Sequence, residues 1–198
     1  MSGGLTAARQ LVDSIGAWRR GCTGPLVVAI DGHGAAGKSL LAQAAGELLE
    51  AAVVHLDDFF REAGTGAGEG ESPMAAYYDW QRARREALAP LRAGQRAAWR
   101  AFDWETNAYL PELVSVGPAT LVLVEGVSAT ADALADLIDR SVLVVTPQPE
   151  RIERLHERID EAVWDEAWLA AEGAYFAERP AAWFDLVVSG SAAADSGR

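Results

Sequence analysis

The segment Gly32-His33-Gly34-Ala35-Ala36-Gly37-Lys38-Ser39 constrains this chain more than any other part of its sequence. An apolar run at 25–31 precedes it and predicts a buried strand, and residues 39–50 after it predict a helix. A glycine-rich turn between strand and helix lets successive backbone N–H groups form an anion-binding concavity. Lys38 is the only lysine among 17 basic residues, and an incidental lysine in a glycine-rich turn is the weaker alternative.

The same segment predicts that the chain binds a nucleoside triphosphate, which we take to be ATP. The N-terminus of the following helix points its positive end at the phosphates. The Ser39 hydroxyl is expected to complete the ligand shell of Mg²⁺. A guanine-reading Asn-Lys-x-Asp segment is absent, because the only lysine is already used. The predicted nucleotide-binding residues are Gly32, His33, Gly34, Ala35, Ala36, Gly37, Lys38, Ser39 and Leu40.

Composition narrows the class of protein. With 198 residues, half of them apolar, the chain is expected to form a single domain over 1–198. The net charge of −12 argues against general binding to nucleic acid or to an anionic membrane. A lone cysteine, Cys22, and the lack of a long apolar run predict a cytoplasmic protein. Composition does not decide whether the chain forms a homodimer.

Strands and helices are expected to alternate, which predicts an α/β fold with a mainly parallel sheet flanked by helices. Residues at about 60–118 are expected to form a substrate-side insert, and 150–172 a long lid-like helix. The acidic, glycine-rich stretch at 62–73 is expected to be a surface loop. Further strands are predicted at 25–31, 52–56, 97–102, 120–125, 141–145 and 185–188, and further helices at 6–20, 39–50, 80–92 and between the strands at 120–125 and 141–145.

Carboxylates follow two of the predicted strands, where the ligand crevice of an open α/β sheet lies. Asp57 and Asp58 follow the strand at 52–56, and we expect Asp57 to accept a proton from an attacking hydroxyl or to hold Mg²⁺. Glu125 ends another apolar run and is a candidate Mg²⁺ ligand. The alternatives are an ordinary acidic turn for the aspartates and a helix-capping role for Glu125.

Arginines at 151, 154 and 158 share one face of the predicted long helix. Such a face could close over a triphosphate and neutralise the charge that develops during transfer. A solvated helix with i,i+4 ion pairs, such as Glu150 with Arg154, would have the same pattern. Both interpretations stay open.

Two segments combine aromatic rings with carboxylates and amides, as a nucleoside or sugar-like acceptor requires. They are 77–82 and 101–107, and core packing is the alternative for their rings. Trp164 and Trp168 are expected to serve packing. The candidate acceptor residues are Asp58, Tyr78, Asp79, Arg82, Phe102 and Asn107.

Five motifs together resemble the uridine kinase branch of the P-loop kinases, which includes phosphoribulokinase-like enzymes. They are Gly32–Ser39, Leu56–Phe60, Tyr78–Trp80, Phe102–Trp104 and Val124–Gly126. The resemblance implies the three-layer sandwich of P-loop NTPases. It also implies that Asp57 is the catalytic base, that Glu125 assists Mg²⁺, that Asp79 holds sugar hydroxyls, and that Arg154 and Arg158 belong to a lid.

The chain departs from this branch at two positions. Phe102 stands where uridine kinases have a tyrosine, and Asn107 where they have a base-contacting histidine. The pyrimidine contacts are therefore not reproduced. We expect a kinase that transfers the ATP γ-phosphoryl group to a small nucleoside- or sugar-like alcohol, with Lys38, Asp57, Arg154 and Arg158 as catalytic residues. The alternatives are a regulatory NTPase and an antibiotic-modifying phosphotransferase.

Overall fold

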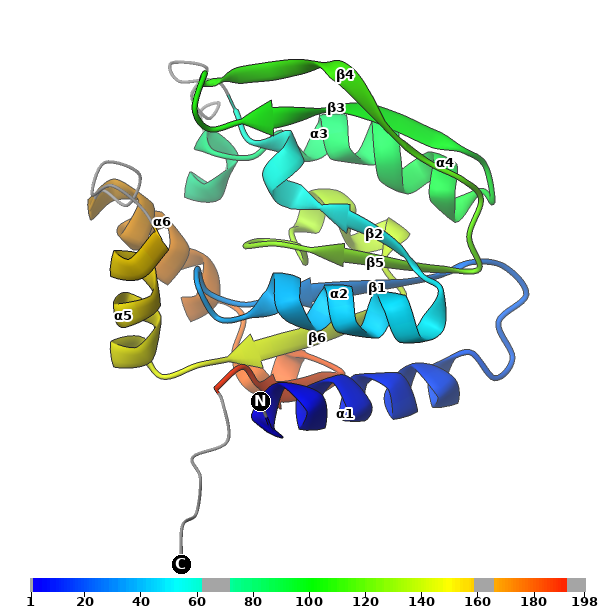
Figure 1. Ribbon diagram of the computed structural model, residues 1–198, viewed down its shortest axis with the longest axis horizontal. Helices are drawn as coiled ribbons and strands as arrows, with labels where there is room; N and C mark the ends of the chain where they lie inside the picture. Colours follow the sequence, from blue (N-terminus) through cyan, green and yellow to red (C-terminus); the bar gives the residue numbers. More distant parts are fainter. Residues whose placement is uncertain (1, 62–71, 159–165, 192–198) are drawn as a thin grey trace, which may run out of the picture.

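A five-stranded parallel sheet forms the centre of the protein (Figure 1). The structure is a computed structural model that describes residues 2–61, 72–158 and 166–191. Every pair of neighbouring strands is parallel, and β1 lies in the middle, between β5 and β6. The strands, in spatial order, are β2 (Ala52–His55), β5 (Leu121–Glu125), β1 (Leu26–Asp31), β6 (Arg140–Val145) and β7 (Leu186–Ser189).

Both faces of this sheet are covered, which explains why its central strands are continuous apolar runs. Val28 and Ile30 of β1 pack in one core with α1 (Ser2–Trp18) and α2 (Lys38–Leu49). Val27 and Ala29 point to the opposite core, which contains short helices and a part of α6 (Glu166–Ala177). The predicted α/β sandwich with a mainly parallel sheet is therefore confirmed.

A β-hairpin and a helical segment lie on the side of β2 (Figure 1). The strand predicted at 97–102 is β3 (Ala97–Asp103), and it pairs with β4 (Ala108–Val116), which the sequence analysis missed. Most residues of β4 are exposed and one is a proline, so the strand lacks a buried apolar pattern. The helix predicted at 80–92 consists of α3 (Trp80–Ala83), a π-helical turn (Arg84–Leu88) and α4 (Ala89–Arg92).

Two further predictions of helices need correction. Instead of one helix over 150–172, the structure has α5 (Gln148–Arg158) and α6, which run in different directions (Figure 1). Residues 159–165 lie outside the described residues. A 3₁₀ segment (Asp132–Leu137) replaces the helix expected between β5 and β6. Within the described ranges, no helix has the length and apolarity needed to cross a membrane.

Candidate active site

The loop between β1 and α2 is folded tightly against the carboxyl end of the sheet. Gly32, Ala35 and Gly37 have positive φ angles of 148°, 58° and 98°. A Cβ atom on Gly32 would lie 2.5 Å from the carbonyl oxygen of Val144, so the packing against β6 also requires glycine there. Lys38 begins α2, and its Nζ donates to the carbonyl oxygen of His33 at 2.9 Å. The ammonium group therefore lies across the loop, where a phosphate chain could bind.

Glu125 places a buried carboxylate beside this loop. Its Oε2 accepts a hydrogen bond from Ser39 Oγ at 3.2 Å, and its Oε1 lies 2.6 Å from Nδ1 of His55. The hydrogen bond with Glu125 raises the pKa of His55, although burial opposes it. In the described part of the chain, no group of three or more His, Cys, Asp or Glu residues could hold a metal alone. A hydroxyl beside a carboxylate fits Mg²⁺, which takes its other ligands from phosphates and water.

Asp57 provides a second carboxylate, in a 3₁₀ turn (Leu56–Phe59) directly after β2. Tyr78 Oη donates to Asp57 Oδ1 at 3.0 Å, which fixes the carboxylate orientation. Asp57 is accessible through the cavity, but the surrounding protein desolvates it, and this burial together with nearby Glu125 raises its pKa. Lys38 and the Tyr78 hydroxyl oppose the shift. A carboxylate with a raised pKa binds a proton more readily, as a general base must.

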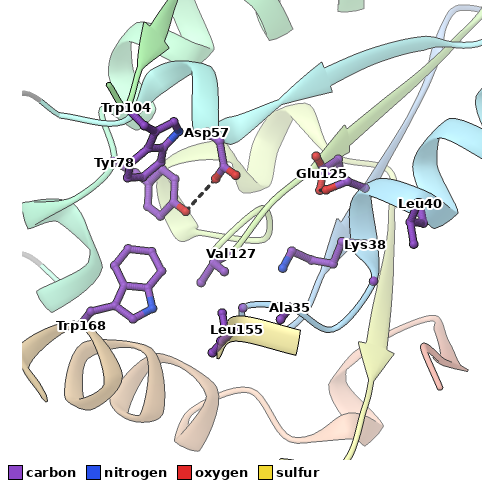
Figure 2. A pocket seen from close by; sticks show the side chains of 13 residues that line it. Ala35, Lys38, Leu40, Asp57, Tyr78, Trp104, Glu125, Val127, Leu155 and Trp168 are labelled. Atoms are coloured by element: carbon purple, nitrogen blue, oxygen red, sulfur yellow. Dashed lines mark hydrogen bonds between the residues drawn. The ribbon is translucent and has the colours of Figure 1, made fainter. Parts of the chain in front are cut away.

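A cavity of about 300 Å³ connects the loop with Asp57 (Figure 2). Its phosphate side consists of loop and α2 residues, and its other side is mostly apolar. Figure 2 shows the rings of Tyr78, Trp104 and Trp168 on the far side of Asp57 from Glu125. The lining residues are Gly34, Ala35, Gly37, Lys38, Ser39, Leu40, Asp57, Tyr78, Trp104, Glu125, Val127, Leu155 and Trp168.

Three solved structures with this arrangement of elements carry kinase in their names. A possible uridine kinase from Bacillus stearothermophilus superposes with a TM-score of 0.70 at 21% identity, covering 92% of this chain and 97% of that one. A proposed fructose transport system kinase from a Silicibacter species superposes with a TM-score of 0.66 at 22% identity, covering 91% of this chain and 98% of that one. D-glycerate 3-kinase from Cryptococcus neoformans superposes with a TM-score of 0.58 at 18% identity, covering 79% of each chain.

The chain has the fold of a P-loop kinase. This agrees with the resemblance in the sequence motifs. No family profile and no curated protein sequence matches the chain, so the likeness is visible only in the structure and in short motifs. At such low identities it establishes the fold, and the reaction has to be argued from the site.

The structure gathers about half of the predicted site residues around the cavity of this P-loop kinase fold. Those that line it are Gly34, Ala35, Gly37, Lys38, Ser39, Leu40, Asp57, Tyr78 and Glu125. Gly32, His33 and Ala36 belong to the loop but do not line the cavity. His33 instead contacts α6, where its ring lies 4.2 Å from that of Phe176.

Several predicted acceptor residues hold the surrounding structure together and do not line the cavity. Asp58 accepts from the indole Nε1 of Trp99 at 2.7 Å. Asp79 caps α3, because its Oδ1 accepts from the backbone N–H of Arg82 at 2.9 Å. Asn107 lies in the β3–β4 turn with a φ of 51°. The acceptor roles predicted for these three residues therefore remain predictions.

Arg82 and Phe102 are also part of the packing. The Arg82 guanidinium donates to Glu86 and to the carbonyl oxygens of Asp58 and Arg100, and it stacks 4.0 Å from the ring centre of Tyr109. Phe102 is 6% exposed and packs in an aromatic cluster with Phe60, Trp104 and Tyr109. Neither side chain lines the cavity.

Arg154 supports the phosphate loop from α5. Its guanidinium donates to the carbonyl oxygens of Ala35, at 3.0 Å, and Gly190, at 2.9 Å, and pairs with Glu150. In this conformation it contacts the loop and does not line the cavity. Arg158 ends α5, and its side chain lies outside the described residues. Its predicted lid role remains a prediction.

The sequence analysis missed Asp31, the last residue of β1. It is fully buried and accepts hydrogen bonds from the backbone N–H groups of Gly32, Ser128 and Thr130, and from the hydroxyls of Thr130 and Tyr175. These bonds join β1, the turn after β5 and α6 at the start of the loop. A charged residue at the end of a buried strand was the available signal, since such a carboxylate has to be paired.

Glu172 of α6 was also missed. Its Oε1 accepts from the Gly34 backbone N–H at 2.6 Å, and its Oε2 lies 2.8 Å from Nδ1 of His33 and 3.7 Å from Arg151. Burial opposes ionisation, but the bonds from His33 and Gly34 outweigh it and lower the pKa of Glu172. No local pattern marks this residue, because its partner in the loop is 138 positions away.

The prediction that Trp168 serves packing was incomplete. Trp168 is 3% exposed within the core, yet it also lines the cavity (Figure 2). Trp164 lies outside the described residues.

Proposed function

We propose that the chain transfers the γ-phosphoryl group of ATP to a hydroxyl of a small-molecule acceptor. The observation that carries this proposal is that one cavity contains the phosphate loop, the Ser39 and Glu125 pair, and the carboxylate of Asp57. A slowly hydrolysing regulatory protein needs no such base beside an apolar recess. The recess next to Asp57 therefore favours an alcohol acceptor over water.

In this proposal the loop amides and Lys38 hold the β- and γ-phosphates. Ser39 and Glu125 would hold Mg²⁺, which when bound neutralises charge on the phosphate oxygens. The acceptor oxygen attacks the γ-phosphorus while the bond to the oxygen that bridges the β- and γ-phosphates breaks, and ADP leaves. Asp57 takes the hydroxyl proton, and Tyr78 keeps the carboxylate turned toward the acceptor.

Exchange of the two adjacent aspartates tests the assignment of the base. We expect Asp57→Asn to bind ATP normally and to lose about 10²–10⁴-fold in kcat, because general-base catalysis contributes that much. Asp58→Asn is the matched control, since its side chain faces Trp99 and an amide oxygen can still accept that bond. Lys38→Ala should abolish turnover and leave the fold intact.

The measurement is ADP release against a panel of nucleosides, sugars, vitamins and hydroxylated antibiotics, with ATP affinity followed separately by calorimetry. Equal losses in the Asp57 and Asp58 variants would contradict the base assignment. ADP release that no alcohol stimulates would favour the regulatory NTPase.

A further inference from the structure

The acceptor side of the cavity is built from aromatic faces. Trp104 in the β3–β4 turn is 44% exposed, and its ring centre lies 4.2 Å from that of Phe60. Trp168 packs 5.9 Å from the ring centre of Tyr78, whose hydroxyl holds Asp57. Figure 2 shows the rings of Tyr78 and Trp104 close to Asp57, with Trp168 further away beyond the Tyr78 ring. Each ring is held by a neighbour, and because Tyr78 and Trp168 are only 2% and 3% exposed, Trp104 provides most of the aromatic surface that a flat apolar group could contact.

The same side lacks a positive charge. Lys38 is the only Lys or Arg among the described residues that line the cavity, and it lies on the phosphate side. Two nearby arginines are held elsewhere, because Arg61 donates to the carbonyl oxygen of Tyr78 and Arg82 is bound within the packing described above. The side chain of Arg158 is not among those described, and its predicted role in a lid over the phosphates remains a prediction.

Of the segments outside the described residues, 62–71 and 159–165 add no positive charge, and the C-terminal segment 192–198 contains one arginine, Arg198. Residues 62–71 and 159–165 contain no Lys or Arg, and all their charged residues are acidic. Carboxylate and phosphate groups on ligands are usually bound by arginine forks or lysines. An anionic acceptor would lie beside Asp57 without a cation among the described residues on its own side of the cavity, and like charges at short range repel.

From these observations we infer that the acceptor is a neutral or cationic alcohol with a flat apolar face, bound against Trp104 and Trp168. We therefore expect phosphorylated sugars and hydroxy acids to be poor acceptors. The inference rests on the proposed kinase activity and deepens it by naming the class of acceptor.

Three benzylic alcohols of similar size, whose para substituents are cationic, neutral and anionic, test this inference. They are para-hydroxymethyl benzylamine, benzene-para-dimethanol and para-hydroxymethyl benzoate, with glycerol as a small alcohol without a flat face. ADP formation with ATP gives kcat/KM for each. We expect the kcat/KM of the amine and the diol to exceed that of the benzoate by about tenfold or more, because of the uncompensated like charge. We expect it to exceed that of glycerol by up to about tenfold, because an aromatic contact is lost.

Substitution of the aromatic residues distinguishes a role in binding the acceptor from a role in holding the fold. Trp104→Ala should raise the acceptor KM about tenfold and leave the KM for ATP unchanged, since Trp104 lies in an exposed turn. Trp183→Ala, at another exposed tryptophan that does not line the cavity, is the control and should change neither. Trp168→Phe keeps an aromatic face in the core position and should have an intermediate effect.

The outcomes are distinguishable. If the chain phosphorylates alcohols but prefers the benzoate or glycerol, the inferred acceptor class is wrong and the kinase proposal stands. An unchanged acceptor KM in Trp104→Ala would have the same meaning. ADP release that is independent of every alcohol would overturn both.

Discussion

The substitution Asp31→Asn tests whether one buried carboxylate holds the phosphate loop to the rest of the fold. In the native chain, Oδ1 accepts from the backbone N–H groups of Gly32 and Ser128, and Oδ2 accepts from the N–H and hydroxyl of Thr130 and from Tyr175. An asparagine has one acceptor oxygen and one donor nitrogen. In either orientation, its NH₂ group therefore opposes at least one backbone N–H group that cannot turn away.

The magnitude follows from these bonds. If the amide nitrogen takes the Oδ2 position, the hydroxyls of Thr130 and Tyr175 can rotate, but the Thr130 N–H is left without a partner. One unsatisfied buried donor costs about 1–3 kcal/mol, and each remaining bond weakens by about 1 kcal/mol on losing the charged acceptor. The variant no longer buries a charge, which offsets a part of this cost. We therefore expect the free energy of unfolding to fall by about 3 kcal/mol. For a chain of this size that lowers Tm by about 6–12 °C.

Thermal unfolding followed by circular dichroism measures this loss. Asp185→Asn is a matched control, because Asp185 also accepts two bonds, from the N–H and Oγ of Ser141, but its side chain is 41% exposed. The free energy of unfolding of Asp185→Asn should fall by less than about 1 kcal/mol, because water can replace the lost hydrogen bonds. If Asp31→Asn lowered Tm by no more than the control does, the loop would not depend on this carboxylate and the reasoning would be refuted.

Three further predictions concern packing and pH. In Gly190→Ala the new Cβ would overlap the carbonyl oxygen of Ala36, so we expect a loss of about 1–3 kcal/mol in chemical denaturation and weaker ATP binding, whereas Gly173→Ala, which has open space, should be neutral or stabilising. Because the pKa of Asp57 is raised above its ordinary value of 3.8, kcat should fall as the pH is lowered through the raised pKa. A pH–kcat profile whose acidic limb lies at or below 3.8 would contradict the effect of burial beside Glu125. The same shift means that ionised Asp57 opposes folding, so Asp57→Asn should raise Tm above that pKa and lose this gain below 3.8.

Local chemistry explains what could be predicted from the sequence. The parallel sheet follows from continuous apolar runs such as 121–124, and the loop from glycines and a lysine at fixed spacing between a strand and a helix. Asp57 and Glu125 were found for a topological reason, because the carboxyl ends of parallel strands meet at one edge whatever the order of the strands. The roles assigned to these residues remain predictions that the experiments above test.

Residues with distant partners could not be assigned in this way. Arg82 and Asp79 stand in a motif of binding-site composition, yet the fold uses both for packing and capping. Glu172 reaches the loop from α6, and Trp168 is at once a core residue and a cavity wall. Which side of a helix faces a cavity depends on how helices pack against one another over long separations in the chain.

The sequence by itself therefore determined the sheet, the phosphate loop and the two carboxylates at the edge of the sheet, because backbone geometry and strand burial act on neighbouring residues. Only the tertiary structure decided which aromatic rings surround Asp57 and which arginines are held elsewhere. Those choices depend on contacts between segments far apart in the chain, and they set the charge and shape of the space left for an acceptor.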